Sequence, residues 1–153
     1  AITARDRAVA YTDIAQQMGL DYQSMPDNQG TWDASEGYQQ TRWLLSQDER
    51  PTAIFASNDM MAVGAAHAIF DCGLTIPNDI SLVGVDDTEV SRHMTPPLTT
   101  VRQPLDQIAH AGIDSLLQLI SHHENENAEP PQPVRMSFEP ELVVRESTAP
   151  LIR

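Results

Sequence analysis

Two short apolar runs, joined by a helix-like segment, dominate the hydrophobic pattern of this chain. Residues 52–57 (TAIFAS) and 80–85 (ISLVGV) are rich in β-branched and other apolar side chains, which is typical of strands buried on both faces. Between them, residues 58–72 follow a helical pattern that begins at a good N-cap, Asn58, and stops before Gly73. This order predicts a βαβ unit, with two parallel strands joined by a right-handed crossover.

Further periodic segments flank this unit. The predicted helices are residues 5–18, 33–46 and 104–121, with a helical turn over 89–94. The predicted strands are residues 20–25 and 98–103, with one or two more within 134–145. Polar, proline-containing stretches at 26–30 and 122–133 are expected to be connections. Alternating helices and strands predict an α/β fold with a mainly parallel sheet.

Two polar pairs, Asn58–Asp59 and Asp86–Asp87, stand at the carboxyl ends of the two central strands. In open α/β sheets, ligands bind in the crevice beyond those ends. The two pairs should therefore be neighbours in space, where their donors and acceptors suit a small polar ligand. Each side chain also has a structural alternative, because Asn and Asp are common helix caps.

Charge and cysteine content narrow the classes of function. The chain of 153 residues carries 22 acidic against 9 basic residues, a net charge of −13 that argues against direct contact with nucleic acid or an anionic membrane. Its one cysteine, Cys72, excludes an internal disulfide and suits a reducing cytosol. No apolar run approaches the length of a membrane span, and no signal peptide opens the sequence. Because the first residue is Ala1, we expect that an upstream segment has been removed.

Five separate motifs carry a family resemblance. They are GTWDASEGYQQT, FASNDMMAVGAAHAI, NDISLVGVDD, TPPLTTVRQPL and ELVVREST. Together, and in this order, they resemble the effector-binding core of the LacI/GalR family of bacterial transcriptional repressors. The spelling is most similar to the lactose-repressor branch of that family.

The resemblance implies a parallel-sheet, Rossmann-like sandwich of the periplasmic-binding-protein type I, of which this chain holds mainly the C-terminal subdomain. It assigns residues 1–103 and 134–148 to that subdomain and residues 122–133 to a connection. The helix of residues 104–121 is expected to pack on an N-terminal subdomain that this chain lacks. A small sugar would bind between the subdomains and control operator binding allosterically. Operator DNA would be bound only through an N-terminal helix-turn-helix, also absent here, in a cytoplasmic protein.

For the ligand site, the resemblance points to five residues, and most have a plain alternative. Asp86 is the strongest candidate, as a charged acceptor for two sugar hydroxyls, while Asn58 offers both a donor and an acceptor. Trp32 offers a flat platform for a sugar ring, although a tryptophan is more often part of a core. Arg7 matches a family arginine that holds sugar hydroxyls, and its alternative is a solvated helix charge. Gln103 stands at the crossover between the subdomains.

The central helix carries two apolar stripes. Met61, Ala65 and Ile69 should pack on the sheet. The second stripe is expected at a homodimer interface, since family members dimerise through this helix and the segment after the acidic pair. The alternative is that a second helix of the same chain covers it. The predicted interface consists of Val63, Ala66, His67, Phe70 and Met94.

Two other classes of function compete with the repressor. A sugar-binding protein of a transport system has the same bilobal fold. An upstream helix-turn-helix would indicate the repressor, whereas a leader peptide would indicate the transport protein. An enzyme is disfavoured, because no nucleophile, phosphate-binding loop or facing carboxylate pair accompanies the acidic residues. His122 and His123 beside Glu124 and Glu126 indicate a solvated linker rather than a metal site, so neither a metal nor a cofactor is predicted.

Overall fold

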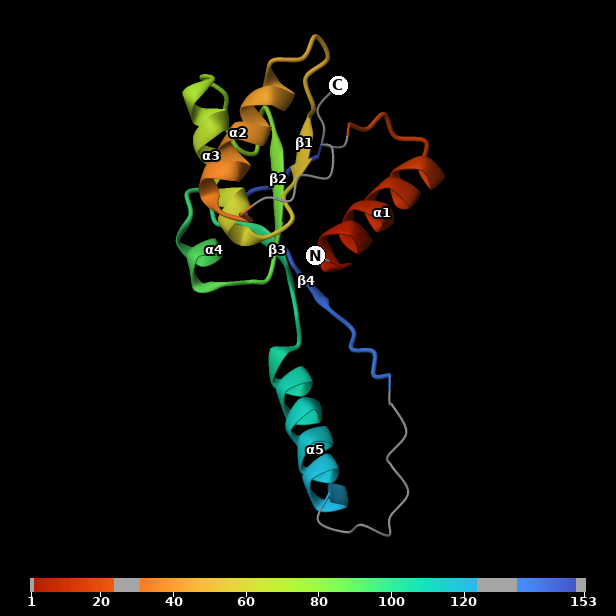
Figure 1. Cartoon of the computed structure of the whole chain (residues 1–153). Helices are drawn as coiled ribbons and strands as arrows, with labels where there is room; N and C mark the ends of the chain where they lie inside the picture. Colours follow the sequence, from red (N-terminus) through yellow and green to blue (C-terminus); the bar gives the residue numbers. More distant parts are fainter. Residues whose placement is uncertain (1, 24–30, 124–134, 151–153) are drawn as a thin grey trace. The chain divides into compact units, whose positions relative to one another are not determined.

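The computed structural model describes residues 2–23, 31–123 and 135–150, in which helices and strands alternate (Figure 1). In chain order the elements are α1 (Ile2–Gln17), α2 (Ala34–Leu45), β1 (Ala53–Phe55), α3 (Asp59–Asp71), β2 (Ser81–Val85), α4 (Glu89–His93), β3 (Thr99–Arg102), α5 (Leu105–His123) and β4 (Glu141–Val143). The chain divides into two compact units. The first comprises residues 1–101 and 142–153, and the second comprises residues 102–141.

The sheet is four-stranded, in the order β1-β2-β3-β4. β1 and β2 are parallel, with Ile54 opposite Leu82, and β2 and β3 are parallel, with Gly84 opposite Thr100. The predicted βαβ unit is therefore confirmed, with α3 as its crossover helix. Asn58 is the N-cap of α3, and Gly73 has the positive φ of 73° that a helix-ending glycine adopts.

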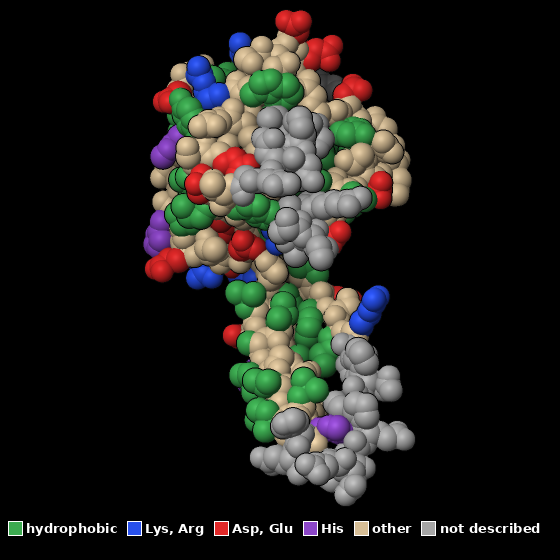
Figure 2. Space-filling model, in the orientation of Figure 1, with side chains coloured by type: hydrophobic (Ala, Val, Ile, Leu, Met, Phe, Trp, Pro, Cys, Tyr) green, Lys and Arg blue, Asp and Glu red, His purple; other side chains and the backbone are tan. Residues whose placement is uncertain are grey.

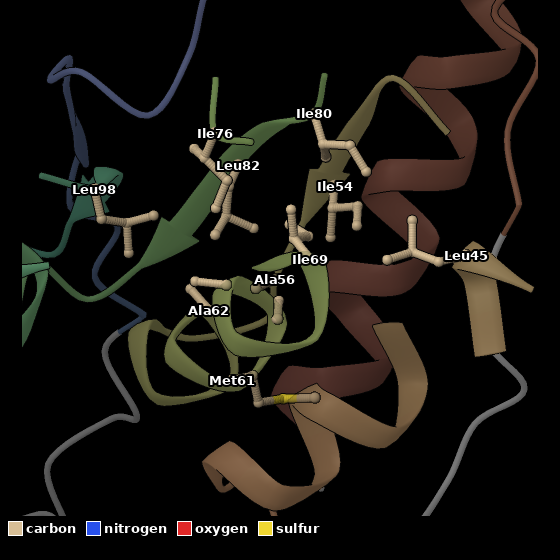
Figure 3. Packing of buried hydrophobic residues seen from close by; sticks show 12 residues of the cluster. Leu45, Ile54, Ala56, Met61, Ala62, Ile69, Ile76, Ile80, Leu82 and Leu98 are labelled. Carbon is tan, nitrogen blue, oxygen red and sulfur yellow. The ribbon is translucent and has the colours of Figure 1, made fainter. Parts of the chain in front are cut away.

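The core lies between the sheet and α3 (Figure 3). Its buried side chains are Leu45, Ile54, Ala56, Met61, Ala62, Ala65, Ala66, Ile69, Ile76, Ile80, Leu82 and Leu98. The expectation that both central strands are buried on both faces is wrong for β1, because Phe55 is 41% exposed. Side chains alternate between the faces of a strand, so Ile54 enters the core while Phe55 stacks on Tyr11 of α1.

The helices α2 and α3 pack backbone to backbone at two glycines. A Cβ placed on Gly64 of α3 would lie 1.8 Å from the carbonyl oxygen of Ala34 in α2. A Cβ on Gly37 of α2 would lie 2.1 Å from the carbonyl oxygen of Met61 in α3. Only glycine leaves room for this close approach of the two helices. The approach brings Met61 of α3 next to α2 (Figure 3).

The packing of α2 on α3 bears on the two alternatives for the second apolar stripe of α3, a homodimer interface or a cover by another helix of the same chain. Met61, Ala65 and Ile69 are buried as predicted. Ala66, predicted at the outward interface, is only 3% exposed and belongs to the core of its own chain. The rest of that stripe is less buried: Val63 is half-buried, Phe70 and His67 are exposed, and Met94 packs partly against the core.

The remaining predicted elements divide into confirmed and wrong ones. The helices at residues 5–18, 33–46 and 104–121, the turn at 89–94 and the strand at 98–103 are all present as α1, α2, α5, α4 and β3. The strand predicted at residues 20–25 is absent over the described residues 20–23, and no strand forms at residues 135–138. The connection predicted at 26–30 lies outside the described residues. The connection predicted at 122–133 is wrong for its first two residues, because His122 and His123 belong to α5, and the rest of it lies outside the described residues.

The second unit consists largely of α5, whose apolar side chains are exposed along its length (Figure 2). One face of α5, the helix that was expected to pack on an N-terminal subdomain, is apolar and about half exposed in this chain; it consists of Ile113, Leu116, Leu117 and Ile120. Among the helices of the described residues, none combines the length and the apolar character that a membrane crossing needs.

The glycine contact between α2 and α3 can be tested by adding one methyl group. Gly64→Ala should lower the free energy of unfolding by about 1–3 kcal/mol or more, because the new Cβ forces two packed backbones apart. Urea denaturation followed by circular dichroism measures this loss. Gly112→Ala is the matched control, since a Cβ there meets nothing within 4 Å on the exposed helix α5. The control should be neutral or stabilising by up to about 1 kcal/mol, and an equal loss in both variants would contradict the close contact.

Candidate functional site

The candidate site begins where β1 ends, at the N-terminus of α3. The side chain of Asn58 caps this helix, because its Oδ1 accepts a hydrogen bond of 2.7 Å from the backbone N–H of Met61. Its Nδ2 donates to the backbone oxygen of Trp32 at 3.0 Å. The structural alternative for Asn58, a helix cap, is thus realised. The amide still has a second N–H and a second lone pair with which to meet a ligand.

The turn after β2 brings the second polar pair to the same edge of the sheet. Asp86 has φ 115° and Asp87 has φ 51°, in a region of backbone conformation that side chains other than glycine rarely adopt. The backbone N–H of Asp86 donates to the oxygen of Val101 on the neighbouring strand β3 at 2.8 Å. This turn directs the Asp86 carboxylate away from the core, where its side chain is 32% exposed.

Arg7 of α1 links the ends of the two strands. Its Nη1 donates to the backbone oxygen of Ser57 at 2.5 Å, and its Nη2 lies 3.8 Å from the Asp86 carboxylate. The contacts of Arg7 and Asn58 therefore place Trp32, Asn58, Asp86 and Arg7 in one neighbourhood. A carboxylate, a guanidinium and an amide grouped in this way supply both acceptors and donors to a hydroxylated ligand.

Trp32 is held in place through its own backbone as well as through Asn58. It adopts a positive φ of 59°, and its N–H donates to Oε2 of Glu36 at 2.8 Å. Asp33 and Glu36 have the sequence spacing of a capping box, which the structure forms in modified form. Oδ1 of Asp33 accepts from the N–H of Glu36, which lowers the pKa of Asp33, while the Glu36 side chain bonds to Trp32 rather than to the cap itself.

A cleft of about 790 Å³ opens beside this group, between α1, α2 and β1. Arg7, Trp32 and Ser57 are among its lining residues, whereas Asn58 and Asp86 adjoin it through these neighbours. Tyr11 lines the cleft and was not a sequence candidate. Its ring stacks on Phe55 with centroids 6.1 Å apart. Burial, and then the nearby Tyr22, raise the pKa of Tyr11, so its hydroxyl stays protonated at neutral pH.

The other acidic residue of each polar pair, Asp59 in one and Asp87 in the other, is buried beneath the site. The Asp87 side chain is 1% exposed and pairs with Arg145, with Arg92 at 3.4 Å as a second cation. Arg145 also donates to the backbone oxygen of Leu98 at 2.7 Å and to Ser91 Oγ at 3.2 Å. Sequence reasoning missed Arg145, although a buried carboxylate requires a cation or several donors and the ELVVREST motif contains this arginine.

Two residues discussed in the sequence analysis, Gln103 and His122, belong to the second unit. Gln103 belongs to the second unit, where its backbone oxygen accepts from Leu105, and its part in the ligand site stays a prediction. His122 lies within the described residues, whereas Glu124 and Glu126 do not. Within the described ranges, no group of three or more His, Cys, Asp or Glu side chains is arranged to hold a metal ion.

Comparison with known proteins places this chain in a family. Residues 2–148 match the model of the periplasmic binding protein-like domain. The HTH-type transcriptional repressor PurR of Haemophilus influenzae (strain PittEE) is 34% identical over 98% of this chain and 44% of its own length. The ribose operon repressor of Escherichia coli (strain K12) is 38% identical over 77% of this chain and 36% of its own.

A solved structure agrees. The lac repressor dimer bound to operator and the anti-inducer ONPF has a TM-score of 0.76 and 34% identity, over 97% of this chain and 49% of that one. The present chain therefore spans about half the length, or less, of the proteins it matches. The fold defines a periplasmic-binding-protein-like α/β core. This chain belongs to that family, as the effector-binding core of the LacI/GalR type.

The buried ion pair beneath the site gives a testable difference in stability. Arg145→Gln leaves the Asp87 charge buried without its closest cation, which should cost about 3–5 kcal/mol of unfolding free energy. Arg102→Gln is the control, because Arg102 pairs with Glu141 where the two side chains are 42% and 67% exposed. That loss should be only about 0–1 kcal/mol. Urea denaturation of both variants decides the matter, and losses of similar size would mean that the buried pair carries no special weight.

Proposed function

We propose that this chain is the effector-sensing core of a transcriptional repressor and that its effector is a small sugar or sugar derivative. The observation that carries the proposal is the group of Arg7, Trp32, Asn58 and Asp86 at the carboxyl ends of β1 and β2. Open α/β sheets bind their ligands at this edge. Two structural neighbours are consistent with a sugar, a transcriptional regulator CelR in complex with cellobiose and a regulator of Enterococcus faecium with bound ribose.

Each side chain has a role that suits a sugar. The Asp86 carboxylate accepts hydrogen bonds from two hydroxyls, and Arg7, beside it, donates to sugar oxygens. Asn58 offers both a donor and an acceptor, while the indole of Trp32 covers the apolar face of the ring. Gln103 would reach the ligand from the crossover between subdomains. The ligand needs no cofactor or metal in this arrangement.

The mechanism in the whole protein is a shift between two arrangements of its subdomains. A sugar held between them must bind one arrangement better than the other, because only differential affinity moves such an equilibrium. The N-terminal subdomain of the whole protein would cover the exposed apolar face of α5. Its position relative to this one would set the spacing of N-terminal helix-turn-helix segments on operator DNA. The net charge of −13 agrees with DNA contact by those segments rather than by this chain.

The alternatives fit these observations less well. A sugar-binding protein for transport uses the same fold, but the relatives reported above are named as repressors, which supports a cytoplasmic regulator. An enzymatic role is disfavoured because Asp59 and Asp87, the buried acids of the site, are held by hydrogen bonds and ion pairs. Such carboxylates are poorly placed to exchange protons with a substrate.

Titration of the chain with sugars tests the proposal. Because the chain lacks half of the proposed cleft, it should bind at millimolar affinity or weaker. Amide shifts in two-dimensional NMR, with methyl β-galactoside, methyl β-glucoside, ribose and cellobiose as probes, report such binding. Asp86→Asn should weaken it by roughly tenfold to a hundredfold, since a hydrogen bond to a charged group contributes about 1.5–3 kcal/mol.

Glu89→Gln is the matched control for this experiment, because Glu89 is exposed on α4 and reaches only His93. It should bind the same probe as the unaltered chain does. If no probe shifts the amides near Asp86, the proposed sugar site is wrong. Micromolar binding by the chain alone would instead contradict the idea that half of the cleft is missing.

We also propose that two copies of the chain associate through the outward face of α3, as an isologous dimer. Ala66 is buried in its own chain, so this face consists of Val63, His67 and Phe70, with Met94 beside it. The printed description of the lac repressor structure as a dimer supports the proposal without fixing the interface.

Phe70→Arg tests the dimer, because a charge at the two-fold axis would be buried against its own symmetry mate. The variant should be a folded monomer, while the unaltered chain is a dimer at about tens of micromolar. Light scattering measures both masses. Trp43→Arg is the control, since Trp43 is an equally exposed aromatic on α2 outside the proposed face. A monomeric unaltered chain, or a dimer indifferent to Phe70→Arg, contradicts this interface.

A further inference from the structure

Asp59 is the most completely enclosed charged side chain among the described residues, and the proposed ligand contacts do not use it. It is the first residue of α3, directly after Asn58, and its exposed fraction is 0%. Its carboxylate accepts three hydrogen bonds from neutral donors. Oδ2 accepts from the backbone N–H and the hydroxyl of Thr88, at 2.7 and 2.9 Å, and Oδ1 accepts from the Thr100 hydroxyl at 2.6 Å.

These three bonds join the elements that carry the site. Thr88 ends the turn that begins with Asp86 and Asp87, while Thr100 lies on β3. The Thr100 hydroxyl also accepts from the backbone N–H of Asp87 at 3.4 Å. One carboxylate thus ties the N-terminus of α3, where Asn58 lies, to the turn that holds Asp86.

The surroundings are shaped to admit this carboxylate. A Cβ on Gly84, in the last part of β2, would lie 2.6 Å from Oδ1 of Asp59. Any larger residue at Gly84 would therefore push the carboxylate away from Thr100. β2, which ends at Val85 directly before Asp86, leaves a space that the Asp59 side chain fills.

The turn needs such support because its backbone is strained. Asp86 and Asp87 both have positive φ, a conformation that persists in residues other than glycine only where the surrounding structure enforces it. A purely structural acid would stabilise the fold as a whole. Asp59 instead bonds to the turn itself, through the backbone N–H and the hydroxyl of Thr88.

We infer that Asp59 is a positioning residue of the ligand site: through Thr88 and Thr100 it holds the strained Asp86–Asp87 turn in the conformation that presents Asp86 beside Asn58. This inference rests on the proposed sugar site for its consequence in binding. Asp59 itself does not touch the ligand.

Two kinds of variant of the full chain test the inference. Asp59→Asn keeps the size but turns an acceptor into an NH₂ donor that faces donors. Thr100→Val removes the hydroxyl that reaches Oδ1, whereas Thr100→Ser keeps it. Asp59→Asn and Thr100→Val should each weaken binding of the sugar probe at least tenfold, and Thr100→Ser should stay within twofold. Ile69→Ala, a core variant of α3 far from the turn, is the control for lost stability and should also stay within twofold.

Amide hydrogen exchange gives a second readout that needs no ligand. In Asp59→Asn the amides of Asp87 and Thr88 should exchange at least tenfold faster, while the amide of Leu82, which donates to the oxygen of Ser147, keeps its rate within twofold. In Ile69→Ala these amides should instead change together.

The two readouts separate the inference from the proposed function. If no sugar binds the unaltered chain, the proposed function fails, and exchange alone decides the positioning role. If Asp59→Asn speeds exchange equally at Leu82 and in the turn, Asp59 only stabilises the fold and the inference is overturned. Unchanged sugar affinity in Asp59→Asn, with the unaltered chain binding, also overturns it.

Discussion

The structure depends on two carboxylates, those of Asp59 and Asp87, which are buried at the carboxyl edge of the sheet and are held there by hydrogen bonds and an ion pair. A buried charge is costly unless hydrogen bonds or an opposite charge replace its water. Asp59 is satisfied by the two threonines Thr88 and Thr100, whereas Asp87 is satisfied mainly by Arg145. Because the donors come from β3, from the turn after β2 and from the segment after β4, the two acids fasten together elements that are distant in sequence.

This arrangement divides each polar pair between two tasks. In each pair one member, Asn58 or Asp86, stays partly exposed, and the other, Asp59 or Asp87, is turned into the protein. The buried member fixes the backbone from which its neighbour projects. Adjacent residues suit this division, because their side chains leave the backbone in different directions.

Much of the fold could be predicted from the sequence because its strongest patterns are local. The N-cap at Asn58, the capping box at Asp33 and the stop at Gly73 lie within one turn of the helix ends that they define. The errors concern partners distant in the chain. The exposed face of β1, the burial of Ala66 and the role of Arg145 depend on which element packs opposite, and periodicity carries no such information. The same limit applies to the site. The strand ends indicated Asn58 and Asp86, but Arg7 was expected from the family resemblance alone, and Tyr11, which lines the cleft and stacks on Phe55, was not expected.

The strain in the turn and the support beneath it have a common consequence for binding. A flexible acidic turn would have to be ordered by the ligand, and the free-energy cost of that ordering would lower the affinity. Here the unusual conformation of Asp86 is already imposed by hydrogen bonds within the protein, which the N–H of Asp86 donates to the oxygen of Val101 and the N–H of Thr88 donates to Asp59. The sugar would meet a carboxylate already in place. Its binding energy would then be available to favour one arrangement of the subdomains over another, which is the requirement for a sensor rather than a mere carrier.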